Sequence, residues 1–131
     1  MTAKSERDRG RRSACPIACT LDEIGDRWTL LVIRDMFFFS KQRFEEFVQS
    51  PERISTNILA DRLKRLEQLG VITKEPYSTH SQRMSYSLTE RGQKLGSILE
   101  ALIHWGLENI PDTSIDDSPL TIDPLSNEEI D

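Results

Sequence analysis

The chain has few of the residues on which secreted proteins and metal sites depend. It holds two cysteines, Cys15 and Cys19, and two histidines, His80 and His104, among 131 residues. Two cysteines cannot supply the disulfide framework of a small secreted protein. The histidines are too far apart in sequence to complete a zinc site with them, so we predict no metal and no other cofactor. Motifs of hydrolase or nucleotide-binding sites are also missing, so we expect that the chain is not an enzyme.

The sequence also lacks an apolar run long enough to cross a membrane. The longest run, around residues 30–39, is interrupted by Arg34 and Asp35, whereas a spanning helix needs about 20 apolar residues. The first 12 residues are polar and basic, unlike a secretory signal peptide. We therefore expect a cytoplasmic protein with no membrane partner, and we interpret residues 1–14 as a flexible basic arm.

The net charge of −5 is unusual for a protein that binds DNA, but the charge is unevenly distributed. Residues 111–131 contain seven acidic side chains and no lysine or arginine. The other 110 residues hold 17 basic and 15 acidic side chains, a net charge of +2. The acidic balance therefore reflects residues 111–131, which we interpret as an acidic mobile tail, and it does not exclude nucleic acid as a partner.

Apolar spacing and capping residues organise residues 15–110 as one domain. Pro16 suits the first turn of a helix, which Gly25 can end. Ser55 can cap a later helix, and Gly70 can end it as a left-handed residue. The helices predicted before residue 70 are 16–24, 28–38, 43–49 and 56–69.

Two strands and a final helix are predicted after Gly70. The strands, 71–75 and 84–88, are joined by a polar loop and predict a hairpin. Thr89 can cap a single long helix that reaches about residue 109. A short helix, a turn and a longer capped helix, followed at once by a hairpin, predict a winged helix-turn-helix. The predicted fold is thus mainly α with a small β-hairpin wing.

A series of short segments carries a more specific signal: Cys15-Pro16, 24–31, Ile33-Arg34-Asp35, Arg43-Phe44, Ile54-Ser55, Leu59, Arg62-Leu63, Leu66-Glu67, Gly70-Val71-Ile72 and 86–92. In this order they resemble the HxlR family of bacterial winged-helix regulators. The resemblance spans about residues 15–109 and implies a dimeric DNA-binding repressor or activator whose first and last helices build the dimer interface. Two stretches depart from the family, which has a Gly-containing turn where residues 37–40 stand and prolines where residues 80–83 stand.

The fourth helix is the predicted recognition helix. Placing residues about 100° apart puts the apolar side chains on one face and polar side chains on the other. Base contacts usually come from the N-terminal part of such a helix, which favours Thr56, Asn57 and Ala60. Asparagine can pair with adenine, and an alanine methyl can meet a thymine methyl. Lys64 and Arg65 lie farther along and suit phosphates, while a merely solvated helix face is the alternative.

Further predicted DNA contacts flank this helix. The start of the third helix can meet the DNA backbone, and the wing can reach a phosphate or the minor groove. Arg62 lies beside the apolar stripe, so we expect it to pair internally with Glu23, Asp26 or Asp35 rather than to read bases. The full predicted set of DNA contacts is Lys41, Gln42, Arg43, Ser55, Thr56, Asn57, Ala60, Lys64, Arg65, His80, Gln82 and Arg83.

Cys15 is a candidate redox sensor. It precedes Pro16 at a helix N-terminus and follows several arginines, and both the helix dipole and positive charge favour the thiolate. The resemblance points the same way, because some members of the family use a cysteine at this place to sense oxidants or quinones. The alternative is that both cysteines are inert, and Cys19 is expected to face the core as a small apolar residue.

Together these features predict a sequence-specific transcription regulator that binds double-stranded DNA as a homodimer on a pseudo-palindromic operator. The regulator can respond to a small-molecule or oxidant effector. The last helix is apolar on more than one side, which favours burial against both its own domain and a second subunit, although a core helix of a single chain is the alternative. The rival function is a winged-helix protein-interaction module that does not bind DNA.

Overall fold

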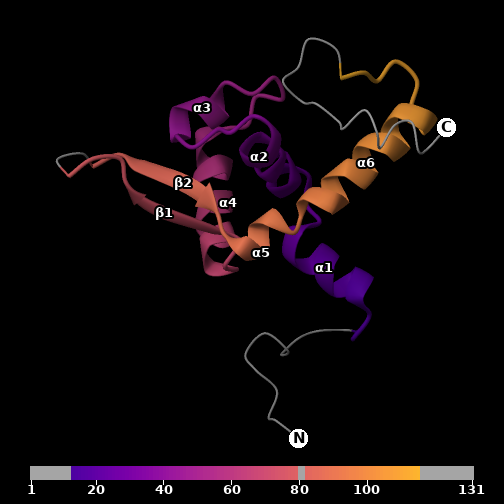
Figure 1. Ribbon diagram of the computed structural model, residues 1–131, viewed down its shortest axis with the longest axis horizontal. Coiled ribbons are helices and arrows are strands. Elements are labelled where there is room, and N and C mark those ends of the chain that lie inside the picture. The colour runs from indigo at the N-terminus through magenta and orange to yellow at the C-terminus, as the bar shows by residue number, and fades with distance from the viewer. Residues whose placement is uncertain (1–12, 80–81, 116–131) are drawn as a thin grey trace, which may run out of the picture.

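In the part of the chain that the structure describes, residues 13–79 and 82–115, there are six helices and one β-hairpin, which extends to one side of the helices (Figure 1). The structure is a computed structural model. The predicted basic arm up to residue 12, His80 and most of the predicted acidic tail lie outside the described residues. The helices are α1 (Pro16–Ile24), α2 (Arg27–Phe38), α3 (Phe44–Val48), α4 (Thr56–Gln68), α5 (Glu90–Gln93) and α6 (Gly96–Asn109), and the strands are β1 (Ile72–Pro76) and β2 (Met84–Leu88).

Side-chain caps and one glycine set the ends of the central helices. Asp26 begins α2, because its Oδ1 accepts hydrogen bonds from the backbone N–H of Trp28 at 3.0 Å and of Thr29 at 3.3 Å. Ser55 begins α4, where its Oγ accepts from the N–H of Ile58 at 3.2 Å. Gly70 follows α4 with φ at +76°, a conformation that a side chain would strain. The predicted cap at Ser55 and the predicted left-handed end at Gly70 are confirmed.

The core lies where α2, α3, α4 and β1 meet. Phe47 of α3, Ile33 of α2 and Leu59 of α4 are almost fully buried. Burial of large apolar side chains is the main favourable contribution to folding, at about 25 cal/mol for each Å² removed from water. The buried apolar side chains are Ile24, Val32, Ile33, Met36, Phe47, Ile54, Leu59, Leu63, Leu66, Val71, Ile72 and Leu99.

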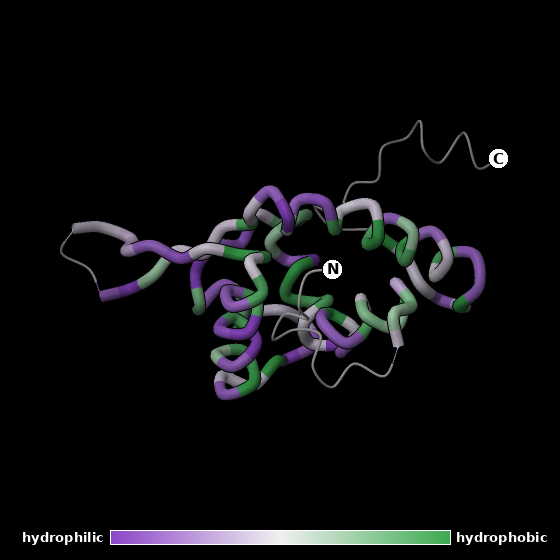
Figure 2. The backbone as a smooth tube through the Cα atoms, turned by 90° about the horizontal axis from the view of Figure 1, so that it is seen from below, coloured by the Kyte–Doolittle hydropathy of each residue, from purple (hydrophilic) through white to green (hydrophobic). Residues whose placement is uncertain are grey.

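The hairpin projects away from the helices as a wing (Figure 2). Its strands are antiparallel, with Ile72 opposite Leu88 and Pro76 opposite Met84. The segment before α3 is attached to β2, because the N–H of Tyr86 donates to the carbonyl of Gln42 at 2.7 Å. The wing is therefore joined to the helix-turn-helix through the middle of β2. The predicted winged helix-turn-helix is confirmed, with β1 beginning one residue later than expected.

The prediction of one long helix after Thr89 is wrong. Thr89 caps only the short helix α5, with its Oγ accepting from the N–H of Gly92 at 3.1 Å. The N–H of Leu95 then bonds to the carbonyl of Gly92 at 3.0 Å, which tightens the chain between α5 and α6. Gly96 lies against the ring of Phe37, and a Cβ at Gly96 would stand only 2.2 Å from that ring. The break therefore lets the start of α6 pack closely on α2.

The sequence leaves open the role of the aromatic run Phe37-Phe38-Phe39 at the end of α2, and the structure shows what Phe37 contacts. Phe37 contacts Gly96, and its ring meets that of Phe38 edge-on at 5.0 Å. Phe39 follows as the residue that caps α2. Ser40 then adopts a φ of +55°, which is uncommon for a residue with a side chain. Ser40 thus holds a left-handed conformation in the turn where the resembled family has a glycine-containing sequence.

Candidate nucleic-acid interface

Helix α4 has one buried face and one exposed polar face. Leu59, Leu63 and Leu66 are buried against the domain. Among the residues predicted to touch DNA, the fold leaves a set exposed that begins at the N-terminal end of α4 and continues along one side. This set is Ser55, Thr56, Asn57, Ala60 and Lys64.

Arg62 is half-buried and is held against the domain by ion pairs. Its Nε lies 3.1 Å and 3.2 Å from the two carboxylate oxygens of Asp26, and its Nη1 lies 2.6 Å from Asp61. Of the three acceptors expected for Arg62, the structure selects Asp26. The other two have different partners, since Glu23 pairs with Arg91 and Asp35 pairs with Arg34. The interpretation of Arg62 as a structural arginine agrees with this geometry.

Asp26 joins the start of α2 to α4, and this junction should weaken in acid. Burial alone would raise the pKa of Asp26, but hydrogen bonds from Thr29 and Arg62 outweigh burial and hold this pKa below its ordinary value. A carboxyl with a lowered pKa stabilises the fold above its unfolded pKa of about 4 and loses that contribution as the pH falls through its folded pKa.

We therefore expect Asp26→Asn to be less stable than the wild type at about pH 6, with a difference that shrinks as the pH falls below about 4. Urea unfolding of both proteins at several pH values measures the difference directly. A gap that stays the same at about pH 3 would contradict the role given to the Asp26 carboxylate.

Arg65 and Lys41 are engaged by the protein. Arg65 reaches back to α1, where its Nη2 donates to the backbone carbonyl of Asp22. The Nζ of Lys41 donates to Ser50 Oγ at 2.9 Å and lies 3.6 Å from the buried carboxylate of Asp35. Both side chains therefore tie helices together in this structure, and their contacts with phosphate stay predictions.

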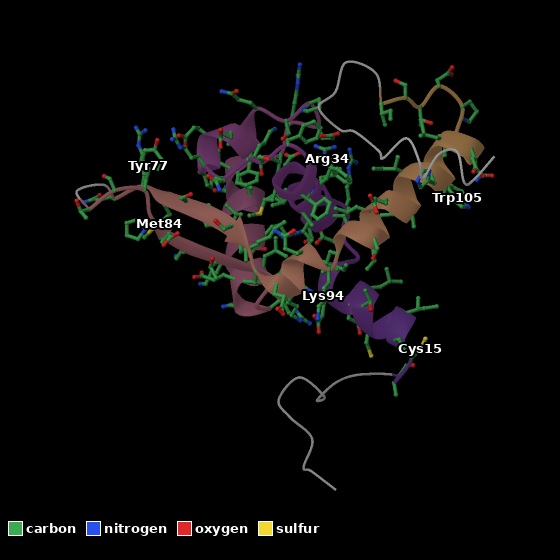
Figure 3. All side chains as sticks on the ribbon, in the orientation of Figure 1. Cys15, Arg34, Tyr77, Met84, Lys94 and Trp105 are labelled. Atoms are coloured by element: carbon green, nitrogen blue, oxygen red, sulfur yellow. The ribbon has the colours of Figure 1, made fainter. Side chains whose placement is uncertain are left out.

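The backbone N–H groups at the N-terminal end of α3 are already hydrogen-bonded within the protein. The backbone N–H groups of Gln42 and Arg43 both donate to Glu46 Oε1 at 2.9 Å, and these bonds lower the pKa of Glu46. A phosphate could use these N–H groups only by displacing Glu46. The guanidinium of Arg43 instead stacks on the ring of Tyr77, 3.8 Å from its centre, where β1 ends toward the tip of the wing (Figure 3). Tyr77 was not identified from the sequence.

The described part of the wing tip presents exposed polar residues. Gln82 and Arg83 are both exposed. The carbonyl of Arg83 accepts from the N–H of Tyr77 at 2.8 Å, which holds the two sides of the hairpin together beyond the strands. His80, the other predicted wing contact, lies outside the described residues.

A charged cluster beneath the helix-turn-helix was missed by sequence reasoning. Arg34 donates to Asp35 Oδ1 at 2.7 Å and 2.9 Å, and to both oxygens of Glu52 at 2.8 Å and 2.9 Å. Ser50 also donates to Asp35. The hydrogen bonds from Arg34 lower the pKa of Glu52, so its carboxylate stays charged. The cluster attaches α2 to the turn before α4. In the sequence, the Arg34-Asp35 pair that interrupts the apolar run of α2 could have indicated it.

The two cysteines lie at the first turn of α1, away from the wing (Figure 3). Cys15 is exposed, and its backbone N–H donates to Ser13 Oγ at 2.9 Å. Cys19 is half-buried, and its thiol lies 3.4 Å from the carbonyl of Ser13. Both are free thiols. Cys19 therefore lies at the edge of the core rather than within it.

The hairpin joined to a helix-turn-helix with an exposed polar face defines a winged helix-turn-helix protein. Residues 23–114 match the HxlR-like helix-turn-helix family, and the chain belongs to this family of transcription regulators. An uncharacterized HTH-type transcriptional regulator of Mycobacterium tuberculosis is 37% identical over 91 residues, which cover 70% of this chain and 56% of the relative. The chain thus spans little more than half the length of that relative.

Solved structures share the fold. A structure described as that of the transcription factor PA1607 aligns with a TM-score of 0.69 at 38% identity, over 79% of this chain and 72% of the other. The reduced form of HypR, described as a redox regulator, aligns with a TM-score of 0.66 at 32% identity, over 74% of this chain and 95% of that one. Within residues 13–79 and 82–115, no helix is long and apolar enough to span a membrane.

Proposed function

We propose that the protein is a sequence-specific DNA-binding transcription regulator that acts in the cytoplasm and is not an enzyme. The observation that carries this proposal is the face of α4, which presents Thr56, Asn57, Ala60 and Lys64 to solvent opposite a buried leucine stripe. A helix of this kind can enter the major groove while the wing reaches the adjacent backbone or minor groove. Membership of a family of transcription regulators supports the same function.

The proposed DNA-binding form is a homodimer. On α1, Ile17 is 71% exposed and Leu21 is 58% exposed, and on α6, Trp105 is 62% exposed and Leu102 is 51% exposed. Apolar side chains gathered on two neighbouring helices support a contact with a second copy. A two-fold axis there would place two α4 helices in successive major grooves, about 34–36 Å apart, on a pseudo-palindromic operator.

Selection of bound duplexes from a random pool tests this function. We expect enrichment of two inverted half-sites separated by about one helical turn or a small multiple of it. A protein-interaction module that does not read DNA would enrich no sequence, and that outcome would overturn the proposal.

Lys64 tests the contact of α4 with phosphate. Its side chain is exposed and one turn beyond Ala60, so we expect Lys64→Ala to weaken binding to all duplexes alike. The slope of log K against log salt should fall in magnitude by about 1, as for the loss of one phosphate contact. Titrations at several salt concentrations measure this slope, with Lys94→Ala, an exposed lysine between α5 and α6, as control. A change of base preference with an unchanged slope would assign Lys64 to the bases instead.

We further propose that Cys15 makes the regulator responsive to oxidants. The thiol is exposed at the start of α1, within the proposed dimer contact, and HypR is described as a redox regulator. We expect diamide to oxidise the two Cys15 thiols of a dimer to one disulfide between the subunits, while diamide itself is reduced to a hydrazine. This oxidation should release the wild-type protein from its selected operator and leave Cys15→Ser bound. Cys19→Ser is the matched control. Release of Cys15→Ser at the wild-type diamide concentration would remove Cys15 from the switch.

A further inference from the structure

A cavity of about 440 Å³ lies between α2 and α6. Apolar side chains from both helices line it, among them Leu30 and Phe38 of α2 and Ile103 of α6. The segment after α6 turns back and supplies a third wall, ending at Ile115 (Figure 1). This segment is fastened to the helix, because Thr113 Oγ1 donates to the carbonyl of Gly106 at 3.1 Å. Small-molecule sites have volumes of this order and are mainly apolar with a few polar groups.

Gly106 keeps the α6 wall of this cavity open. A glycine inside a helix costs about 1 kcal/mol relative to alanine, so such a residue calls for a reason. A Cβ at Gly106 would meet no atom within 4 Å, so packing within the described chain does not demand a glycine there. The missing side chain instead leaves space inside the cavity, which fits an occupant other than the protein's own side chains.

Arg34 sets the charge that the occupant can carry. Arg34 lines the cavity, and its guanidinium is already paired with two carboxylates, Asp35 and Glu52. These partners take four of the five N–H groups of Arg34 and compensate its positive charge. One N–H on Nη1 is left for an acceptor, as far as the described residues go. A neutral molecule with one oxygen acceptor therefore suits the site better than an anion.

The cavity and the proposed dimer contact use different faces of α6. Successive residues of a helix are about 100° apart, which places Ile98 and Trp105 on one face and Ile103 and Gly106 on the neighbouring one. Trp105, which lies outside the cavity, is 62% exposed and belongs to the proposed dimer contact. Leu102, at the boundary, lines the cavity and is half-exposed. A second copy seated on the Trp105 face leaves the α2–α6 cavity for another occupant.

We propose that the α2–α6 cavity is an effector site for an uncharged, mainly apolar small molecule with one hydrogen-bond acceptor, whose occupation is transmitted to α4 through Arg34. An acceptor that bonds to the remaining N–H of Arg34 Nη1 shares this nitrogen with Glu52, so it draws the guanidinium toward the cavity and weakens the bond from Nη1 to Glu52. Glu52 lies in the turn just before α4, so occupation loosens the support of the recognition helix. The transmission rests on the proposed DNA-binding function, whereas the binding site does not.

Two fluorescent dyes of similar size test the site in the full chain without DNA. 6-Propionyl-2-(dimethylamino)naphthalene is neutral and has one ketone oxygen, and 8-anilinonaphthalene-1-sulfonate is an anion. We expect saturable binding of the neutral dye, one per chain, at least about tenfold tighter than binding of the anion. Equal affinity for both dyes, or no saturable binding of the neutral dye, overturns the site.

Variants of α6 and of the Arg34 pair locate the binding. Gly106→Leu fills the cavity and should weaken binding of the neutral dye at least about tenfold. Ser97→Leu, at an exposed position of α6 outside the cavity, should leave the affinity for this dye within about twofold of the wild-type value. Glu52→Gln removes one of the negative charges that compensate Arg34, so the affinity for the anionic dye should rise at least about fivefold. Light scattering should show the wild-type subunit number for Gly106→Leu, and a changed number would make the cavity a subunit contact and overturn the proposal.

The transmission is tested by titrating the selected operator with and without saturating neutral dye. We expect the dye to weaken DNA binding at least about fivefold in the wild type, and by linkage DNA should weaken dye binding by the same factor. In Glu52→Gln this coupling should disappear. Dye binding without any effect on DNA affinity overturns the transmission alone, and a failure to bind any DNA overturns the proposed function while the dye titrations still decide the site.

Discussion

Replacing Asp35 with alanine is expected to lower the free energy of unfolding by roughly 3–5 kcal/mol, the usual cost of removing one partner from a buried ion pair. Asp35 is only 3% exposed and accepts hydrogen bonds from Arg34 and Ser50, with the ammonium group of Lys41 3.6 Å away. Its loss leaves two cations beneath the helix-turn-helix with only Glu52 to compensate them. The turn between α3 and α4 should therefore lose its attachment to α2.

Urea unfolding followed by tryptophan fluorescence measures the effect of Asp35→Ala. Glu52→Ala is the matched control, because Glu52 pairs with the same arginine but its side chain is 27% exposed, and its loss should cost about 1 kcal/mol. Operator affinity should fall together with stability in Asp35→Ala, since the support of α4 is lost. A cost below about 1 kcal/mol would show that the cluster is not a principal attachment of the turn.

Local signals predicted the elements whose ends depend on neighbouring residues. The hydroxyl of Ser55 and the left-handed Gly70 mark the start and end of α4 because each acts within a few residues of its own position. The same local patterns could not show the break between α5 and α6. Apolar spacing continues across it, and the contact that accompanies it, Gly96 on the ring of Phe37, joins residues almost 60 positions apart in the chain.

In the candidate site, the sequence predicted which way a side chain points but not which residue it bonds to. Helical spacing predicted that Arg62 turns toward the domain, but only the packing of α2 on α4 selects Asp26 as its acceptor. Spacing also placed Arg65 near the exposed face, whereas the nearby end of α1 draws its guanidinium to a carbonyl there. A long flexible side chain can reach several neighbours, so helical spacing predicts the direction in which it leaves the backbone but not the position of its charged group.

The proposed effector cavity and the turn that supports α4 share one charged cluster. Arg34 lies on the wall of the α2–α6 cavity and also holds Glu52, three residues before the cap of α4. In the proposed mechanism, the cavity and the recognition helix are thus linked through the ion pair of Arg34 with Glu52.

Asn57→Ala is expected to weaken binding to the selected operator by about 1–3 kcal/mol, or about five- to 150-fold, and to relax the preference for adenine at one position of each half-site. The side chain of Asn57 is exposed near the N-terminal end of α4. Its amide N–H can donate to N7 of adenine, while its amide oxygen accepts from the N6 amino group. The stability of the fold should change by less than about 0.5 kcal/mol, because the side chain is exposed.

Titrations with the operator and with its single-base variants separate this role from a general loss of affinity. Gln68→Ala is the matched control, since Gln68 is an exposed amide on the same helix but at its C-terminal end, far from the predicted base contacts. If Asn57→Ala lost affinity equally for every base variant, Asn57 would contact the backbone, and base reading would pass to Thr56 and Ala60. A loss confined to adenine-containing sites would instead assign Asn57 to one base pair and fix the orientation of α4 in the groove.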